Sequence, residues 1–131
     1  MRCAPLVLIV DDAADNREAY VEYLRFRGFA TREAASGGQA LDIALKERPD
    51  VVLLDIRLPD MNGLEVSRRV RATASLRHTK VIAVSACVLP SDVSQALESG
   101  CHSFLQKPCL PDALVEEMNR LIQREDTPPA C

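Results

Sequence analysis

The feature that most limits how this chain can fold is a fivefold alternation of short apolar runs and longer amphipathic segments. The runs are Leu6–Val10, Phe29–Ala34, Val51–Leu54, Lys80–Ser85 and His102–Gln106. Three of them consist almost entirely of Val, Leu, Ile or Ala, as is typical of strands covered by helices on both faces. Phe29–Ala34 also contains Arg32 and Glu33, which favours an edge strand.

The segments between these runs have the spacing of amphipathic helices. Apolar residues fall on one helical stripe in the second, fourth and last segments: Leu41, Ala44 and Leu45; Val93, Ala96 and Leu97; Leu114, Val115, Met118, Leu121 and Ile122. We interpret all three stripes as parts of the core.

Signals for the ends of the helices agree with this pattern. Asp15 and Asn62 each precede a Glu by three residues, a spacing that predicts helix N-caps. Gly28 and Gly100 follow helical segments, where a residue in the left-handed conformation commonly ends a helix.

Five strand–helix units in this order predict one parallel sheet with helices on both faces. For so short a chain we expect the flavodoxin-like, doubly wound (βα)5 fold of the α/β class, with strand order 2-1-3-4-5. The ligand crevice of that fold lies at the carboxyl ends of the first and third strands. We predict one domain over residues 1–124, and a tail or the start of a linker over residues 125–131.

Composition excludes several classes of protein. With 131 residues and a net charge of −3, the chain lacks the basic excess of a nucleic-acid-binding face. It contains no apolar run long enough for a membrane span and no export signal, so we expect a cytoplasmic protein. The five cysteines show no metal-ligand spacing, and their odd number suits a reducing compartment.

Three carboxylates follow the strands that border the predicted crevice: Asp11 and Asp12 after the first, and Asp55 after the third. Any one of them alone is as well explained as a loop residue or a helix cap, although Asp15 already fills the cap position of the first helix. Two such charges about 4 Å apart repel by roughly 4 kcal/mol at an effective dielectric near 20. Such a group persists if a cation neutralises it or if one member stays protonated. Because its ligands are all oxygens, with no Cys or His beside them, we expect a hard cation, Mg²⁺ or alternatively Mn²⁺.

Two further polar residues lie at the ends of the next two strands. Ser85 ends the fourth strand and Lys107 follows the fifth. Alone, each is an ordinary hydroxyl or a solvated charge. A metal, an ammonium and a hydroxyl together suit the three oxygens of a transferring phosphoryl group, so this combination predicts a phosphoryl-transfer site.

These motifs together resemble the response regulator receiver domains of two-component signalling, such as the chemotaxis regulators. The resemblance rests on Asp11-Asp12, on the segment DIRLPDMNG at Asp55–Gly63, on Ser85-Ala86 and on Lys107-Pro108, and it covers about residues 6–123. It implies that Asp55 accepts a phosphoryl group from a histidine kinase or a histidine phosphotransfer protein.

The resemblance also implies how the site is built. Asp11, Asp12, Asp55 and the backbone carbonyl of Arg57 would hold Mg²⁺, and Lys107 would pair with the phosphoryl group. Asp55, Lys107 and Ser85 are thus the expected catalytic residues.

A conformational switch is implied as well. The Ser85 hydroxyl would move toward the phosphoryl group and Phe104 would turn inward, which changes the face made by the fourth helix, the fifth strand and the fifth helix, about residues 91–123. A downstream effector would bind there, and a homodimer through this face is an alternative. Ser85 replaces the family's threonine, and Phe104 lacks a tyrosine hydroxyl.

Two neighbouring residues are candidates for tuning the lifetime of the acyl phosphate, because they flank the path of attacking water: Arg57, two residues after Asp55, and Cys87, two after Ser85. We expect a signalling switch rather than an enzyme that turns over a separate substrate. Phosphatases and phosphomutases with an aspartyl nucleophile usually have a second acid where Arg57 stands. An interaction module without phosphoryl chemistry would not need Asp12, Asp55, Ser85 and Lys107. The chain is either a stand-alone regulator or the N-terminal part of a longer one.

Overall fold

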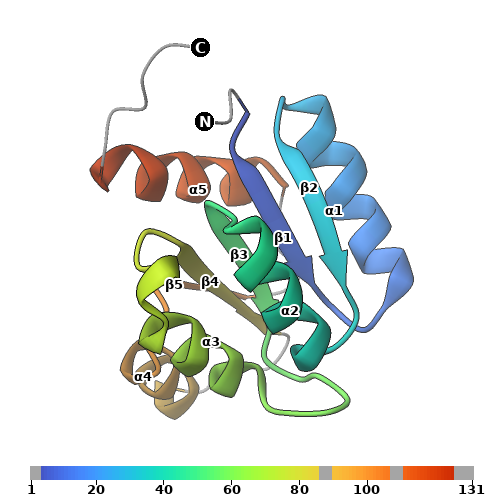
Figure 1. Cartoon of the computed structure of the whole chain (residues 1–131). Helices are drawn as coiled ribbons and strands as arrows, with labels where there is room; N and C mark the ends of the chain where they lie inside the picture. The colour runs from blue at the N-terminus through green and yellow to red at the C-terminus, as the bar shows by residue number, and fades with distance from the viewer. Residues whose placement is uncertain (1–3, 86–89, 107–110, 126–131) are drawn as a thin grey trace.

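Five strands form a single parallel sheet in the order β2-β1-β3-β4-β5 (Figure 1). The computed structural model describes residues 4–85, 90–106 and 111–125. The strands are β1 (Leu6–Val10), β2 (Ala30–Ala34), β3 (Val51–Asp55), β4 (Lys80–Ser85) and β5 (Ser103–Gln106). The helices are α1 (Ala14–Phe26), α2 (Gly37–Glu47), α3 (Gly63–Ala72), α4 (Pro90–Glu98) and α5 (Pro111–Glu125), with a short 3₁₀ helix at Ala74–Leu76. The predicted fold class and strand order are confirmed.

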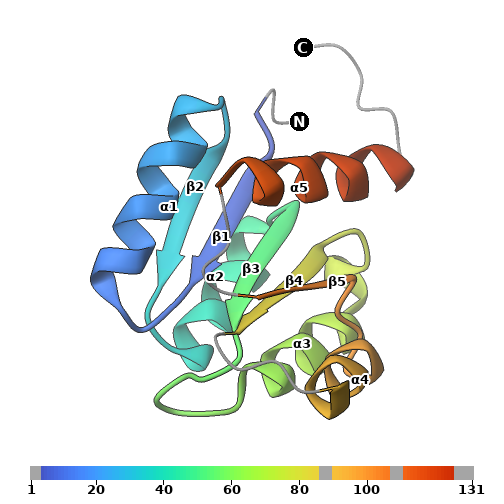
Figure 2. The same ribbon diagram turned by 180° about the vertical axis from the view of Figure 1, so that it is seen from behind.

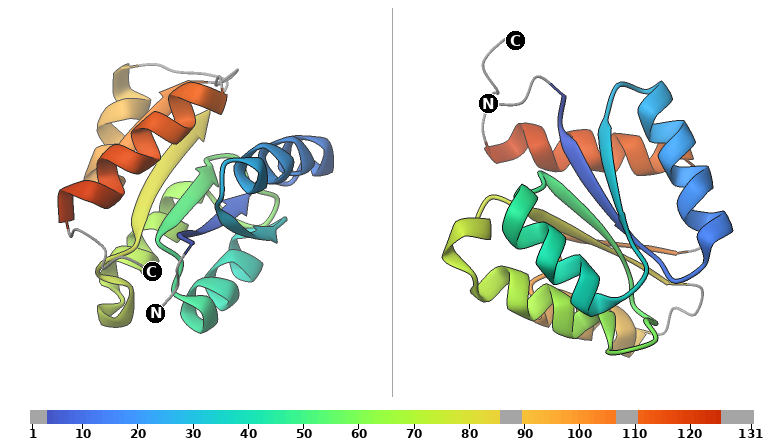
Figure 3. Two further views of the ribbon diagram at one scale, coloured as in Figure 1. Left: turned by 90° about the horizontal axis from the view of Figure 1, so that it is seen from above. Right: turned by 45° about the vertical axis from the view of Figure 1, so that its right-hand side comes forward.

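Alternate residues of the central strands enter two separate cores. Leu8, Val10, Val52 and Leu54 pack with residues of α2, α3 and α4 on the face seen in Figure 1. Val7, Ile9, Val51 and Leu53 pack with residues of α1 and α5 on the opposite face, which Figure 2 shows. Figure 3 shows the sheet between these two layers of helices. Because β1 and β3 are covered on both sides, β1 is apolar throughout and β3 is apolar up to its last residue, Asp55.

The edge position of β2 explains its mixed sequence. β2 pairs only with β1 in the described sheet, and its Arg32 and Glu33 are exposed while Thr31 and Ala34 are buried. Charged side chains on such an edge discourage pairing with another chain. The prediction of an edge strand at this position is confirmed.

Most of the predicted helix ends are correct. Asn62 caps α3 by accepting a hydrogen bond from the Leu64 N–H at 2.8 Å. Gly28 and Gly100 both have a φ of 95°, in the left-handed region. The prediction for Asp15 is wrong, because α1 begins at Ala14 and Ala13 occupies its N-cap position without a side-chain bond. Asp15 lies inside the first turn, where a negative charge interacts favourably with the helix dipole.

Two residues of the predicted apolar stripes do not reach the core. Leu45 is 51% exposed and Leu97 is 55% exposed. Among the described side chains of these two helices, Ala40, Ala44 and Ala96 are fully buried instead. Small side chains there allow the helix backbone to lie close to the sheet, which leaves the neighbouring leucines at the edge of the interface. Within the described segments, no helix has both the length and the apolar character of a membrane span.

Candidate functional site

Three carboxylates meet where β1 and β3 end. The parallel register pairs Val10 with Leu54, so the residues that follow lie at the same edge of the sheet. Asp11, Asp12 and Asp55 each offer an oxygen within 4.8 Å of the other two. Asp11 is buried, Asp55 is half-buried and Asp12 is exposed. The structure thus brings together the three acids that the sequence places at the ends of these strands.

This group fits a hard divalent cation. Its three members supply only oxygen ligands, which Mg²⁺ and Mn²⁺ accept and which Zn²⁺ sites rarely use alone. A buried carboxylate beside two others is costly unless a positive charge offsets the repulsion. Because Asp12 is exposed, a cation can reach the group from solvent.

The first turn of α1 holds Asp11 in place. Its Oδ1 accepts a hydrogen bond from the Ala13 N–H at 2.9 Å, and its Oδ2 accepts one from Asn16 Nδ2 at 3.4 Å. Arg17 donates to the Asp11 carbonyl oxygen at 2.6 Å and forms an ion pair with Glu33 at 3.2 Å. Asp11 does not cap α1, whose N-cap position is Ala13, but these hydrogen bonds give it a local structural role.

The sequence analysis did not identify Asn16 and Arg17 as candidate functional residues. The available signal is their position, five and six residues after Asp11, because the first turn of a helix that leaves a strand must lie beside the end of that strand.

The loop from β3 to α3 closes tightly beside Asp55. The Arg57 N–H donates to Asp55 Oδ1 at 3.0 Å, and the Gly63 N–H donates to the Ile56 carbonyl oxygen at 2.6 Å. Arg57 and Asn62 form an antiparallel bridge across the loop. The side chain of Arg57 is exposed, while its backbone lies next to the acidic group.

Asp60, in the middle of this loop, binds the beginning of α2. Its two carboxylate oxygens accept hydrogen bonds from the Gly37 N–H at 2.8 Å and the Gly38 N–H at 2.9 Å. The bonds from the Gly38 and Gly37 amides lower the pKa of Asp60 below its ordinary value. A lowered pKa in the folded state means that this contact stabilises the fold at neutral pH and is lost as the pH falls through that pKa.

Asp60 was also missed as a functional candidate, because its partners lie 22 and 23 residues earlier in the chain. Sequence spacing contains no signal for such a contact.

The other predicted site residues lie on neighbouring strands. Ser85 is buried at the end of β4, and Val84 before it pairs with Asp55. Phe104 on β5 pairs with Ala83 and is partly buried against the core under α2, α3 and α4. Lys107 and Cys87 lie outside the described residues, so their predicted roles stay predictions.

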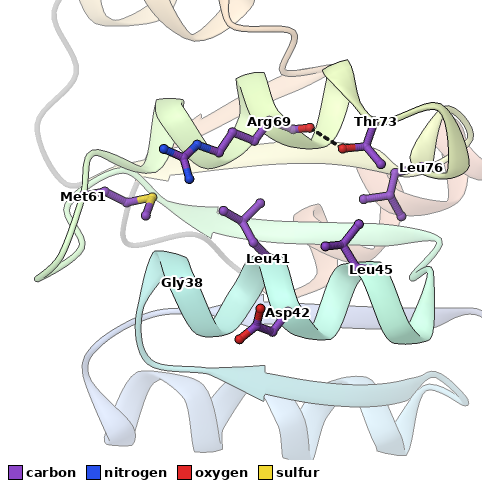
Figure 4. A pocket seen from close by; sticks show the side chains of 8 residues that line it. All are labelled: Gly38, Leu41, Asp42, Leu45, Met61, Arg69, Thr73 and Leu76. Atoms are coloured by element: carbon purple, nitrogen blue, oxygen red, sulfur yellow. Dashed lines mark hydrogen bonds between the residues drawn. The ribbon is translucent and has the colours of Figure 1, made fainter.

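A groove of about 400 Å³ runs between α2 and α3, next to this loop (Figure 4). Its lining residues are Gly38, Leu41, Asp42, Leu45, Met61, Arg69, Thr73 and Leu76. Leu41, Met61 and Leu76 provide an apolar surface, and Asp42 and Arg69 supply charges at its edges. The acidic group does not line this groove, which is a separate feature of the surface.

Comparison with known proteins supports the family and the fold. The sequence matches the response regulator receiver domain family over residues 7–119. The chain belongs to this family.

The chain is 34% identical over 110 residues to the polar-differentiation response regulator DivK of Brucella anthropi, covering 84% of this chain and 89% of that protein. A receiver domain protein of Methanospirillum hungatei JF-1, described as CheY-like, superposes with a TM-score of 0.87 at 26% identity, over 92% of this chain and 95% of that one. Chemotaxis protein CheY4 of Vibrio cholerae gives a TM-score of 0.85 at 29% identity, over 90% of this chain and 98% of that one.

Replacing Gly63 tests how tightly the loop is packed against Asp55. A Cβ at this position would lie 2.3 Å from the Asp55 carbonyl oxygen and 2.8 Å from Ile56 Cα. These are backbone atoms, so Gly63→Ala must displace the end of β3 and is expected to cost about 1–3 kcal/mol in the free energy of unfolding. Denaturant unfolding measures this loss.

Gly38→Ala is the matched control, because Gly38 also lies in the first turn of a helix and its Cβ would meet only Asp60 Oδ2, at an ordinary 3.4 Å. Equal stability of the two variants would contradict the packing described here.

Proposed function

We propose that this chain is a phosphoacceptor receiver domain that accepts a phosphoryl group on Asp55 from a histidine kinase or a histidine phosphotransfer protein. The observation that carries the proposal is the convergence of Asp11, Asp12 and Asp55 at the carboxyl edge of β1 and β3. Membership of the response regulator receiver domain family supports it. In this reaction a carboxylate oxygen of Asp55 attacks phosphorus, the bond to the donor's histidine nitrogen breaks, and an acyl phosphate forms.

The residues around Asp55 have distinct roles in this proposed reaction. Asp11, Asp12, Asp55 and the backbone carbonyl of Arg57 would hold Mg²⁺ or Mn²⁺, which when bound would supply positive charge against the phosphoryl oxygens. Ser85 donates its hydroxyl to one phosphoryl oxygen, and Lys107 pairs with another. Asn16 and Arg17 keep Asp11 oriented through the hydrogen bonds described above.

Phosphorylation would act as a two-state switch. Ser85 ends β4, and Phe104 lies on the adjacent β5 in partial contact with the core, so a movement at the site can reach the outer face through neighbouring strands. The output face is formed by α4, β5 and α5. We infer that a downstream effector binds there, with a homodimer through the same face as an alternative.

The protein is proposed to act as a cytoplasmic switch, without direct nucleic-acid binding or membrane insertion. The only reactions that we propose it catalyses are its own phosphorylation at Asp55, from an external donor, and its own dephosphorylation. An aspartyl phosphatase or phosphomutase is disfavoured, because Arg57 stands where those enzymes usually carry a second acid.

Phosphorylation of Asp55 can be tested with a small phosphodonor. Incubation with acetyl phosphate and Mg²⁺ should add the mass of one phosphoryl group, detected by intact mass spectrometry. Asp55→Asn removes the nucleophile with little change in shape and should abolish the adduct. Asp42→Asn, which alters an exposed acid on α2, is the control and should be phosphorylated like the wild type. A wild type that gains no mass, or an adduct that persists in Asp55→Asn, would refute the assignment.

Metal binding can be measured through stability. Mg²⁺ should bind the acidic group only in the folded state, where the three acids are assembled. A Mg²⁺ concentration of about 100 times Kd then adds about 2.7 kcal/mol to the free energy of unfolding, so the melting temperature should rise by several degrees. Asp12→Ala should largely remove this response, while Asp15→Ala, an exposed acid outside the group, should keep it. Without Mg²⁺, Asp12→Ala should melt higher than the wild type because it relieves repulsion. An unchanged wild-type melting curve at millimolar Mg²⁺ would rule out the site.

Arg57 is proposed to shield or orient the water that hydrolyses the acyl phosphate. The side chain of Arg57 is exposed, two residues after Asp55 in the chain. The backbone N–H of Arg57 donates a hydrogen bond to Asp55 Oδ1, which holds this part of the loop beside the carboxylate. Arg57→Ala should change the autodephosphorylation rate severalfold, measured by decay of the phosphorylated species, and Arg57→Lys should stay nearer the wild type. Equal rates for all three proteins would refute this role. Cys87 is proposed to contribute to the same lifetime.

A further inference from the structure

The loop that leaves Asp55 is attached to α2, a helix that contributes no residue to the acidic group. Asp60 makes this attachment with both carboxylate oxygens, which accept the Gly37 and Gly38 amides at 2.8 and 2.9 Å. The next amide of α2, that of Gln39, donates to the Ser36 hydroxyl oxygen at 3.2 Å. The loop therefore supplies the acceptors for the first two amides of the helix, which the helix itself leaves without an internal acceptor.

The packing around this contact is close on the helix side, where the side chain of Met61 lies against Gly37. A Cβ at Gly37 would lie 2.5 Å from Met61 Cγ and 2.6 Å from its Sδ. The missing side chain leaves room for Met61, which follows Asp60 directly. Hydrogen bonds at Asp60 and close packing at Met61 thus fix two consecutive loop residues against the start of α2.

Both ends of the same loop are joined to the acidic group. At its beginning, the Arg57 amide binds Asp55 Oδ1 at 3.0 Å. At its end, Gly63 lies so close to the Asp55 carbonyl oxygen that a Cβ there would be 2.3 Å from it. A displacement of the middle of this short loop must therefore move the backbone of Arg57, the backbone of Asp55, or both.

We propose that Asp60 is a positioning residue for the phosphorylation site, holding the Arg57–Asn62 loop against α2 so that the Arg57 carbonyl and the Asp55 carboxylate keep the spacing needed for the divalent cation. This inference rests on the proposed function of Asp55. It assigns to Asp60, a residue outside the acidic group, an effect on the binding of the cation and on phosphorylation.

The test is the Mg²⁺ affinity of Asp60 variants, measured by isothermal titration calorimetry on the full chain. Asp60→Ala removes both acceptors and should weaken Mg²⁺ binding by about tenfold, the lower end of the loss that outer supporting contacts cause in other metal sites. Asp60→Asn keeps one acceptor oxygen and should lie between Asp60→Ala and the wild type. The rate of phosphorylation by acetyl phosphate should fall in the same order.

The controls separate positioning from general destabilisation. Asp42→Ala removes an exposed carboxylate from the neighbouring surface and should leave Mg²⁺ affinity unchanged, which excludes a simple charge effect. Gly37→Ala displaces the loop through Met61 rather than through Asp60 and should weaken Mg²⁺ binding too. Amide NMR spectra should show shifts at Gly37, Gly38 and Arg57 in Asp60→Ala.

The outcomes are distinguishable. If Asp60→Ala is less stable but binds Mg²⁺ and accepts phosphate as the wild type does, Asp60 is only a structural contact and the inference is overturned. If the unmodified wild type neither binds Mg²⁺ nor accepts a phosphoryl group, the proposed function itself fails, and this is seen without any substitution at position 60.

Discussion

The parallel pairing of β1 with β3 is the constraint on which the rest of the site depends. It ends the two strands side by side and forces Asp11, Asp12 and Asp55 within 4.8 Å of one another. Such proximity is unfavourable for three negative charges, and burial of Asp11 increases the cost. The two apolar cores on either side of the sheet hold the strands in this register, so hydrophobic burial offsets the electrostatic repulsion that makes the group a receptor for a cation.

Two structures on opposite sides keep these acids oriented. On one side, the first turn of α1 binds Asp11 through the Ala13 amide, Asn16 and Arg17. On the other, the loop from β3 binds Asp55 through the Arg57 amide, and Asp60 joins that loop to α2. The site is therefore supported by helices on both faces of the sheet, although the acids themselves belong to strand ends. A flexible loop alone would not hold a carboxylate against its neighbours.

The sequence predictions succeeded where a local pattern decides the structure. Strand positions followed from apolar runs, and Gly28, Gly100 and Asn62 ended or began helices as expected, because backbone conformation and capping depend on near neighbours. They failed where a feature depends on packing. Leu45 and Leu97 fit an apolar helical stripe but remain about half exposed, since the adjacent alanines bring the helix close to the sheet. The cap predicted at Asp15 was also wrong, because an N-cap at Asp15 would start the helix at Asn16, whereas α1 begins two residues earlier, at Ala14.

The amino-acid sequence by itself determined the class of fold and the chemical nature of the acidic group, because periodicity and the residues after each strand are local properties. The strand order was predicted from the usual topology of so short a chain of this class, and the structure confirms it. Only the tertiary structure decided that Asn16 and Arg17 hold Asp11, that Asp60 binds the start of α2, and that Gly63 has no room for a side chain. The contact of Asp60 joins residues that are 22 positions apart in the chain, and the contact of Gly63 depends on how closely its backbone approaches that of Asp55. Their distances exist only once the whole sheet has packed against its helices.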